Sequence, residues 1–270
     1  MANEQGKKVK DSEFLSTLER GLQVMGVFGR EQPEMSLSDV AAAAKLSPAV
    51  ARRCLNTLTE LGYMARNGRR FLLLPKMLKF GDAFLASTNV EQAVMPALQN
   101  LRDETGDTIM MGVPVDHHVI GIAHVSTAKA IRPSGNIGTS FPLYGTSLGK
   151  AILAFLPEDE LDDYLATAQR PAITPNTKTD RNVLLKELQQ IKKEGFATSD
   201  GEYDYGIFAI AVPIFDDERK VIASINASTS KSQSDKLEYV DSRLPIMRET
   251  ANHIEREIRK FPTLLRSLRA

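Results

Sequence analysis

Residues 36–74 read SLSDVAAAAKLSPAVARRCLNTLTELGYMARNGRRFLLL, and the capping residues in this stretch predict two successive helices. Ser36 is followed three residues later by Asp39, a pattern typical of a helix N-terminus, where a carboxylate is favourable. Ser47 and Pro48 begin a second helix, because serine caps the backbone and proline at the first helical position has no hydrogen bond to lose. The first of these helices is short and alanine-rich, and the second is longer.

The same stretch ends in a predicted hairpin. Gly62 stops the longer helix near Leu61, and residues 63–74 alternate loosely around Asn67-Gly68, a dipeptide that favours a tight turn. Upstream, residues 14–28 predict a helix with an apolar stripe at helical spacing, which consists of Leu15, Leu18, Leu22 and Met25. Helix, short helix, turn, longer helix and hairpin follow one another as in a winged helix-turn-helix, whose third helix enters the DNA major groove.

The polar side chains of this module are of the types that bind DNA. On the longer helix, Ala51, Leu55 and Leu58 are expected in the core, which leaves Arg52, Arg53 and Asn56 for base edges and phosphates. Arginines around the hairpin tip are expected to clamp phosphates. The predicted DNA-binding residues are Ser47, Arg52, Arg53, Asn56, Arg66, Arg69 and Arg70. The alternative is that these arginines only form a solvated basic face.

The charge distribution supports a nucleic-acid partner. The whole chain of 270 residues has 34 basic and 34 acidic side chains and no net charge. Residues 1–80, however, hold 13 Lys or Arg against 8 Asp or Glu, a net charge of +5, and the rest of the chain carries −5. Between Lys45 and Lys79, eight basic residues oppose only Glu60. A neutral average therefore hides a basic module joined to an acidic one.

Downstream of this module, the pattern predicts an α+β unit. Strands are expected over residues 108–115, 119–125, 207–215 and 221–227, and helices over 91–104, 148–156, 158–168, 180–194 and 240–260. We predict a winged helix-turn-helix domain over residues 12–74, a linker helix over 75–90 and a sensor-like domain over 91–262.

One motif favours an enzyme instead. Residues 145–149 read GTSLG and satisfy the G-x-S-x-G pattern of serine hydrolases, which would make Ser147 a nucleophile with Asp200 and His253 downstream. The pattern requires a preceding central strand, whereas the residues before it are few and include Pro142. A serine esterase or amidase is therefore the alternative function.

Other functional classes find less support in the sequence. No apolar stretch approaches the length of a membrane span, and the N-terminus lacks the apolar core of a secretory signal, so we expect a cytoplasmic protein. A single cysteine, Cys54, excludes an intrachain disulfide and is expected to pack in the core. His117 and His118 are adjacent on a strand and would point to opposite faces, so we predict no metal and no cofactor.

Both halves together resemble the IclR family of bacterial transcription regulators over about residues 14–260. Residues 37–63 are similar to the family's helix-turn-helix, with Arg53 at the position of the recognition-helix arginine. The segment PLYGTSLGKA at 142–151, the segment GIFAIAVPI at 206–214 and Asn226-Ala227-Ser228 are similar to its C-terminal domain. The paired arginines and the Asn226 strand look most like the branch that controls aromatic-acid catabolism through protocatechuate, 4-hydroxybenzoate or β-ketoadipate.

The resemblance implies a GAF-like domain that binds a small organic acid, and a homodimer, possibly a homotetramer, that reads operator DNA. Carried over by position, the implied effector-binding residues are Ser147, Leu148, Ser199, Ala209, Asn226 and Ser228. Tyr144 is added to the predicted pocket because it lies close to them in sequence and its side chain can stack or hydrogen-bond. Ser199 is expected on a loop, and Asn226 and Ser228 are expected on one face of a strand. Some members of the family have an acidic residue and a cysteine where this chain has Ser199 and Ala209, which leaves the particular acid open.

Overall fold

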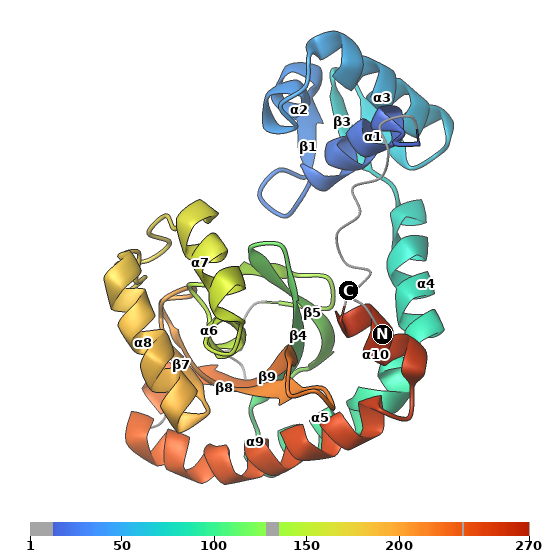
Figure 1. The fold of residues 1–270 in the computed structure, drawn as a ribbon. Coiled ribbons are helices and arrows are strands. Elements are labelled where there is room, and N and C mark those ends of the chain that lie inside the picture. The colour runs from blue at the N-terminus through green and yellow to red at the C-terminus, as the bar shows by residue number, and fades with distance from the viewer. Residues whose placement is uncertain (1–12, 128–134, 234, 270) are drawn as a thin grey trace. The chain divides into compact units, whose positions relative to one another are not determined.

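The computed structural model describes residues 13–127, 135–233 and 235–269. The chain divides into two compact units between Asp82 and Ala83. In the first unit the elements are α1 (Ser16–Gly26), β1 (Glu34–Ser36), α2 (Leu37–Ala43), α3 (Pro48–Glu60), β2 (Met64–Asn67) and β3 (Arg70–Leu73) (Figure 1). This order confirms the predicted winged helix-turn-helix.

The caps of α2 and α3 lie where the sequence places them. The Ser36 side chain accepts a hydrogen bond from the Asp39 amide, and the Asp39 carboxylate accepts one from the Ser36 amide, which together form a capping box. Ser47 caps α3, and Pro48 is its first residue. The apolar side of α3, which includes Ala51, Leu55 and Leu58 together with the free Cys54, is buried in the core of this unit.

Three details of the first unit differ from the sequence analysis. The first helix is shorter than residues 14–28, and the short strand β1, which pairs with β3, was not predicted. The hairpin turn consists of Gly68 and Arg69, because Asn67 already pairs with Arg70, and Gly68 adopts the left-handed backbone that glycine tolerates. The apolar stripe predicted for this first helix is present and lies at the surface, with Leu18 and Leu22 60% and 55% exposed.

Two helical elements precede the sheet of the second unit. The predicted linker helix is found as a 3-10 turn, η1 (Pro75–Met77), followed by α4 (Leu78–Thr88). A long helix, α5 (Val90–Thr105), then leads into the first strand. None of the helices in the described parts of the chain combines the length and the apolarity needed to cross a bilayer.

The second unit is built on an antiparallel sheet whose six strands, within the described residues, have the order β6-β5-β4-β9-β8-β7. They are β4 (Thr108–Val115), β5 (His118–Val125), β6 (Ser140–Pro142), β7 (Ala197–Asp200), β8 (Ile207–Phe215) and β9 (Val221–Ser230). The four long strands were predicted, although the predicted end of β9 at residue 227 falls short of its observed end at Ser230. The short edge strands β6 and β7 were not, because neither has an alternating apolar pattern.

Helices cover both faces of this sheet (Figure 1). On one face, α5, α9 (Lys236–Ile258) and α10 (Pro262–Arg269) pack on Ile109 and Met111 of β4. On the other face, α6 (Ser147–Leu153), α7 (Glu158–Thr167) and α8 (Arg181–Glu194) form a second core with Met110. Successive residues of β4 thus pack into cores on opposite faces of the sheet, because side chains alternate between the two faces along a strand. The final helix α10 was not predicted.

A candidate ligand pocket and a candidate nucleic-acid interface

Strand register gathers polar side chains on the face of the sheet that α6 covers. Thr108 on β4 pairs with Ser228 on β9, Ser228 with Ala209 on β8, and Ala209 with Ser199 on β7. These four residues form a row across neighbouring strands. Ser199 therefore lies on strand β7, and its expected place on a loop is wrong, because four residues without an apolar alternation give no strand signal.

A second row lies two residues along the same strands. Met110 on β4 pairs with Asn226 on β9 and with His124 on β5. Residues two apart on a strand share a face, so Asn226 and Ser228 point to the same side, as predicted. His124 is not among the predicted site residues, although its register opposite Met110 brings it to the same face.

The N-terminus of α6 faces these rows. Thr146 caps the helix by accepting a hydrogen bond from the Gly149 amide at 3.1 Å, which places Ser147 and Leu148 in the first turn. The Ser224 hydroxyl on β9 donates to the Leu148 carbonyl at 2.9 Å and ties α6 to the sheet. A Cβ at Gly149 would lie 2.2 Å from the Leu143 carbonyl oxygen, so the glycine permits this close packing.

A cavity lies between α6 and the sheet. Six of the seven predicted effector residues line it: Ser147, Leu148, Ser199, Ala209, Asn226 and Ser228. The remaining lining residues were not predicted: Thr108, Met110, His124, Phe141, Thr146, Tyr203, Asp204 and Ile207. Phe141 and Tyr203 come from opposite edges of the sheet and meet edge to face, with ring centroids 5.1 Å apart.

Tyr144 is not part of the cavity lining. Its hydroxyl donates a hydrogen bond to the Pro171 carbonyl at 2.7 Å, and its ring lies in the core under α6. Burial raises the pKa of Tyr144 above its ordinary value. The structure thus gives this tyrosine a packing partner and a backbone acceptor, and does not bring it together with the other six residues.

Several polar groups on the cavity wall are available to a ligand. Ser147 is 1% exposed, and neither its Oγ nor the Asn226 Oδ1 has a hydrogen-bond partner within the described residues. Such buried polar atoms are costly unless something pairs with them. Burial lowers the pKa of His124, so its ring is neutral at pH 7 and offers one donor and one acceptor. Methionine, phenylalanine and leucine side chains supply the apolar walls between these groups.

The predicted DNA-binding residues all lie on the surface of the first unit. Arg52, Arg53 and Asn56 are exposed on α3 opposite its buried side. Ser47 is exposed at the helix N-terminus, where its hydroxyl accepts a long hydrogen bond of 3.4 Å from the Val50 amide. An exposed helix of this composition has the groups that pair with guanine and adenine in the major groove.

The hairpin arginines differ in their surroundings. Arg66 donates to the Gly68 carbonyl at 2.8 Å and lies over the Phe71 ring, and Arg70 donates to the Glu34 carbonyl at 3.0 Å. Arg69 is exposed in the turn and makes no hydrogen bond or ion pair with any described residue. Two of the three guanidinium groups are thus oriented by backbone carbonyls, Arg66 by one in the hairpin turn and Arg70 by one on β1.

Comparison with known proteins identifies the chain. A family model described as the IclR helix-turn-helix domain matches residues 17–68, and one described as the bacterial transcriptional regulator IclR C-terminal region matches residues 82–256. The chain belongs to the IclR family. The predicted family and the predicted class of function, a DNA-binding transcriptional regulator, are confirmed.

Individual relatives of this IclR-family regulator align along most of their length. The Pca regulon regulatory protein of Pseudomonas putida is 32% identical over 238 residues, which are 88% of this chain and 82% of that protein. The p-hydroxybenzoate hydroxylase transcriptional activator of Acinetobacter baylyi is 26% identical over 253 residues, 92% of this chain and 93% of its own length. A solved transcriptional regulator from Rhodococcus sp. RHA1 aligns with a TM-score of 0.75 at 31% identity, covering 92% of this chain and 99% of that one.

The hydrolase motif finds a different explanation in the IclR-family fold. Ser147 lies on the α6 face of the sheet, whereas His253 is exposed on α9, which packs on the opposite face. Asp200 is engaged by Lys231 and Lys236. The residues before Ser147 form no central strand, because β6 ends at Pro142 on the sheet edge. Ser147, Asp200 and His253 therefore do not come together as a catalytic triad. Gly149 instead permits close packing of α6, and Ser147 lines the cavity.

Proposed function

We propose that the cavity of this regulator binds a small aromatic carboxylate, and that occupancy of the cavity changes the affinity for operator DNA. The observation that carries the proposal is the buried Ser147 hydroxyl, which has no partner among the described residues and shares a cavity with Asn226 and His124. Hydroxyl, amide and neutral imidazole groups can all donate to a carboxylate or a phenol. The names of the Pseudomonas and Acinetobacter relatives support an effector from aromatic-acid catabolism.

The lining of the cavity suits a small aromatic acid. Met110, Phe141 and Leu148 provide apolar surface, and polar groups at the wall fix orientation, which is the usual composition of a small-molecule site. A ligand shifts a conformational equilibrium only through a difference in its affinity for the two states. The effector must therefore bind more tightly in one of the two arrangements that the regulator adopts on and off DNA.

In the DNA-binding part, Arg52, Arg53 and Asn56 read base edges, and Arg66, Arg69 and Arg70 hold phosphates. Their exposure and residue types support these roles. Ser47 adds a hydroxyl at the start of α3. We assign DNA binding to residues 12–74, the link to 75–90 and effector binding to 91–262.

The exposed stripe on α1 supports a homodimer. Phe14, Leu15, Leu18 and Leu22 are each at least 50% exposed, and an apolar row of this kind is a common protein contact. A twofold dimer would read two half-sites, and pairing of dimers would give a tetramer. The regulator acts in the cytoplasm, where its operator lies, and performs no catalysis.

The effector role is tested by isothermal titration of the purified protein with 4-hydroxybenzoate, protocatechuate and benzoate. We expect one of these acids to bind, and we expect Asn226→Ala to weaken that binding about 10-fold or more, because a hydrogen bond to a charged group is lost. Asn182→Ala, an exposed asparagine on α8, is the matched control and should bind as the native protein does. Equal affinity in Asn226→Ala would remove Asn226 from the site.

A further inference from the structure

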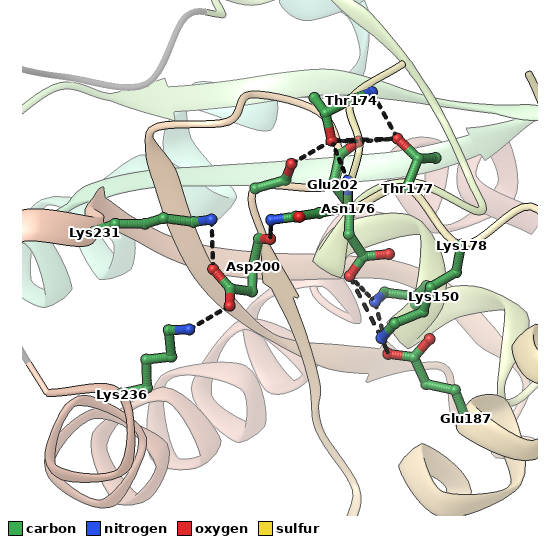
Figure 2. Close-up of polar contacts among 11 residues, drawn as sticks. Lys150, Thr174, Asn176, Thr177, Lys178, Glu187, Asp200, Glu202, Lys231 and Lys236 are labelled. Carbon is green, nitrogen blue, oxygen red and sulfur yellow. Dashed lines mark hydrogen bonds and ion pairs between the residues drawn. The ribbon is translucent and has the colours of Figure 1, made fainter. Parts of the chain in front are cut away.

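A buried cluster of charges lies beside the cavity without lining it (Figure 2). Lys150 on α6 is fully buried, and its Nζ lies 2.6 Å from a Glu202 carboxylate oxygen and 2.8 Å from a Glu187 carboxylate oxygen. Lys178, whose side chain is 38% exposed, contacts the Glu187 carboxylate at 2.6 Å and the Glu202 carboxylate at 3.7 Å. Two cations, one buried and one partly exposed, thus balance two anions. Removing one member would leave a buried charge uncompensated, which is costly.

Two members of the cluster have pKa values shifted in favour of their charged forms. Burial alone would raise the pKa of Glu187, but Lys150 and Lys178 hold the pKa below its ordinary value. Burial alone would lower the pKa of Lys178, but Glu187 and Glu202 hold it above its ordinary value. The attraction between Glu187 and Lys178 is therefore present throughout the physiological range.

The Lys150–Glu202 pair joins two walls of the cavity. Lys150 lies on the helix whose first turn contributes Ser147 and Leu148. Glu202 lies in the loop of residues 201–206 between β7 and β8, and the next two residues of this loop, Tyr203 and Asp204, line the cavity. The carboxylate of Glu202 points toward Lys150 (Figure 2). Glu202, which lines no part of the cavity itself, is thus the sequence neighbour of two residues that do.

Further hydrogen bonds hold the backbone of the same loop (Figure 2). The Thr174 hydroxyl donates to the Gly201 carbonyl at 2.6 Å, and the Thr177 hydroxyl donates to the Glu202 carbonyl at 2.7 Å. The Asn176 amide donates to the Asp200 carbonyl at 2.9 Å, just before the loop. Side chain and backbone of Glu202 are therefore anchored on separate segments of the chain.

We propose that Glu202 is a positioning residue of the effector pocket, whose ion pair with Lys150 fixes Tyr203 and Asp204 at the distance from α6 that the effector requires. The inference rests on the proposed function, since it concerns the affinity of the same cavity. It predicts the direction in which the effector affinity changes when Glu202 loses its charge. Removing the negative charge of Glu202 near an anionic effector would relieve Coulomb repulsion and strengthen binding, whereas loss of the positioning contact weakens it.

The test compares Glu202→Gln with Glu187→Gln. Both variants remove one carboxylate from the same cluster and weaken contacts to the same two lysines, but only Glu202 belongs to the loop that lines the cavity. The first measurement is amide hydrogen exchange of the loop in the full protein without ligand. The second is the dissociation constant for 4-hydroxybenzoate, protocatechuate and benzoate by titration calorimetry, at a temperature where native and variant proteins are folded.

We expect both variants to melt earlier than the native protein, faster exchange of the 201–206 amides in Glu202→Gln alone, and a dissociation constant raised about 5-fold or more in Glu202→Gln alone. Equal exchange in the two variants, or an unchanged or tighter dissociation constant in Glu202→Gln, would overturn the proposal. If the native protein binds none of the three acids, the proposed effector is wrong, and the exchange measurement still decides whether Glu202 positions the loop.

A second pair of variants covers the case in which Glu202→Gln does not fold. Thr177→Val removes the hydrogen bond to the Glu202 carbonyl without changing any charge. Thr179→Val, an exposed threonine two residues on, is the matched control. Faster loop exchange in Thr177→Val alone supports the same positioning role, and equal exchange in both variants contradicts it.

Discussion

Replacing Gly149 by alanine should destabilise the C-terminal unit, because α6 approaches the chain at Leu143 more closely than a side chain allows. A Cβ at position 149 would lie 2.2, 2.3 and 2.5 Å from the carbonyl oxygen, Cα and carbonyl carbon of Leu143. All three are backbone atoms and cannot rotate away, so the whole helix must shift. Overpacking of this kind costs about 1–3 kcal/mol, and alanine recovers at most about 1 kcal/mol of helix propensity.

Three backbone contacts this short place the overpacking cost at the top of its range, so the net loss in the free energy of unfolding is about 2 kcal/mol. For a unit that spans residues 83–270, this corresponds to a decrease of about 4–8 °C in Tm. Gly145→Ala is the matched control in the same motif. Its Cβ would meet nothing closer than 3.7 Å, which is ordinary contact, so its stability should change by less than about 0.5 kcal/mol.

Thermal unfolding followed by circular dichroism measures both variants, and calorimetric titration with the bound acid measures the consequence for the cavity. Gly149→Ala should also weaken effector binding, because Ser147 and Leu148 move with the helix. An unchanged Tm for Gly149→Ala, or equal decreases in the two variants, would refute the packing explanation of this motif.

Two further predictions concern assembly and pH. Leu18→Glu, which places a charge in the exposed α1 stripe, should change the species seen in sedimentation velocity from dimer to monomer. Leu237→Glu, at a leucine that is also exposed but lies on α9, should not. A dimer in Leu18→Glu would exclude the stripe as the contact. Burial raises the pKa of Tyr164 to about 12, above the ordinary value of 10.0, so its contribution to stability is complete below pH 10 and is lost as pH rises toward 12. Urea unfolding should therefore show a smaller loss of stability between about pH 8 and pH 11 in Tyr164→Phe than in the native protein, and equal losses would contradict this origin.

The sequence predicts the elements that carry strong local signals. Caps at Ser36 and Ser47, and the Asn67-Gly68 dipeptide near the hairpin turn, are short-range features, and the structure places α2, α3 and the hairpin accordingly. The edge strands β6 and β7 have three and four residues and gain their hydrogen bonds from partners far along the chain. Local composition cannot show such pairing, so Ser199 was expected on a loop.

The cavity was predicted only in part for a related reason. Residues such as Ser147 and Asn226 were found through resemblance to a family. His124 lines the cavity because of its strand register opposite Met110, and this register cannot be deduced from the sequence. Phe141 and Tyr203 meet from opposite edges of the sheet, a contact that depends on its curvature. Tyr144 was expected in the pocket because it adjoins Ser147 in sequence, but its side chain packs under α6 instead.

The most direct test of the regulator is its binding to the intergenic DNA upstream of its own gene, at fixed and stated salt, with and without 4-hydroxybenzoate, protocatechuate or benzoate. We expect specific binding that one of these acids shifts. We also expect Arg53→Ala to lose specific DNA binding while retaining the acid, and Asn226→Ala to retain DNA binding while losing the shift. Specific DNA binding that no acid alters, together with no acid bound by calorimetry, would contradict an effector pocket under α6.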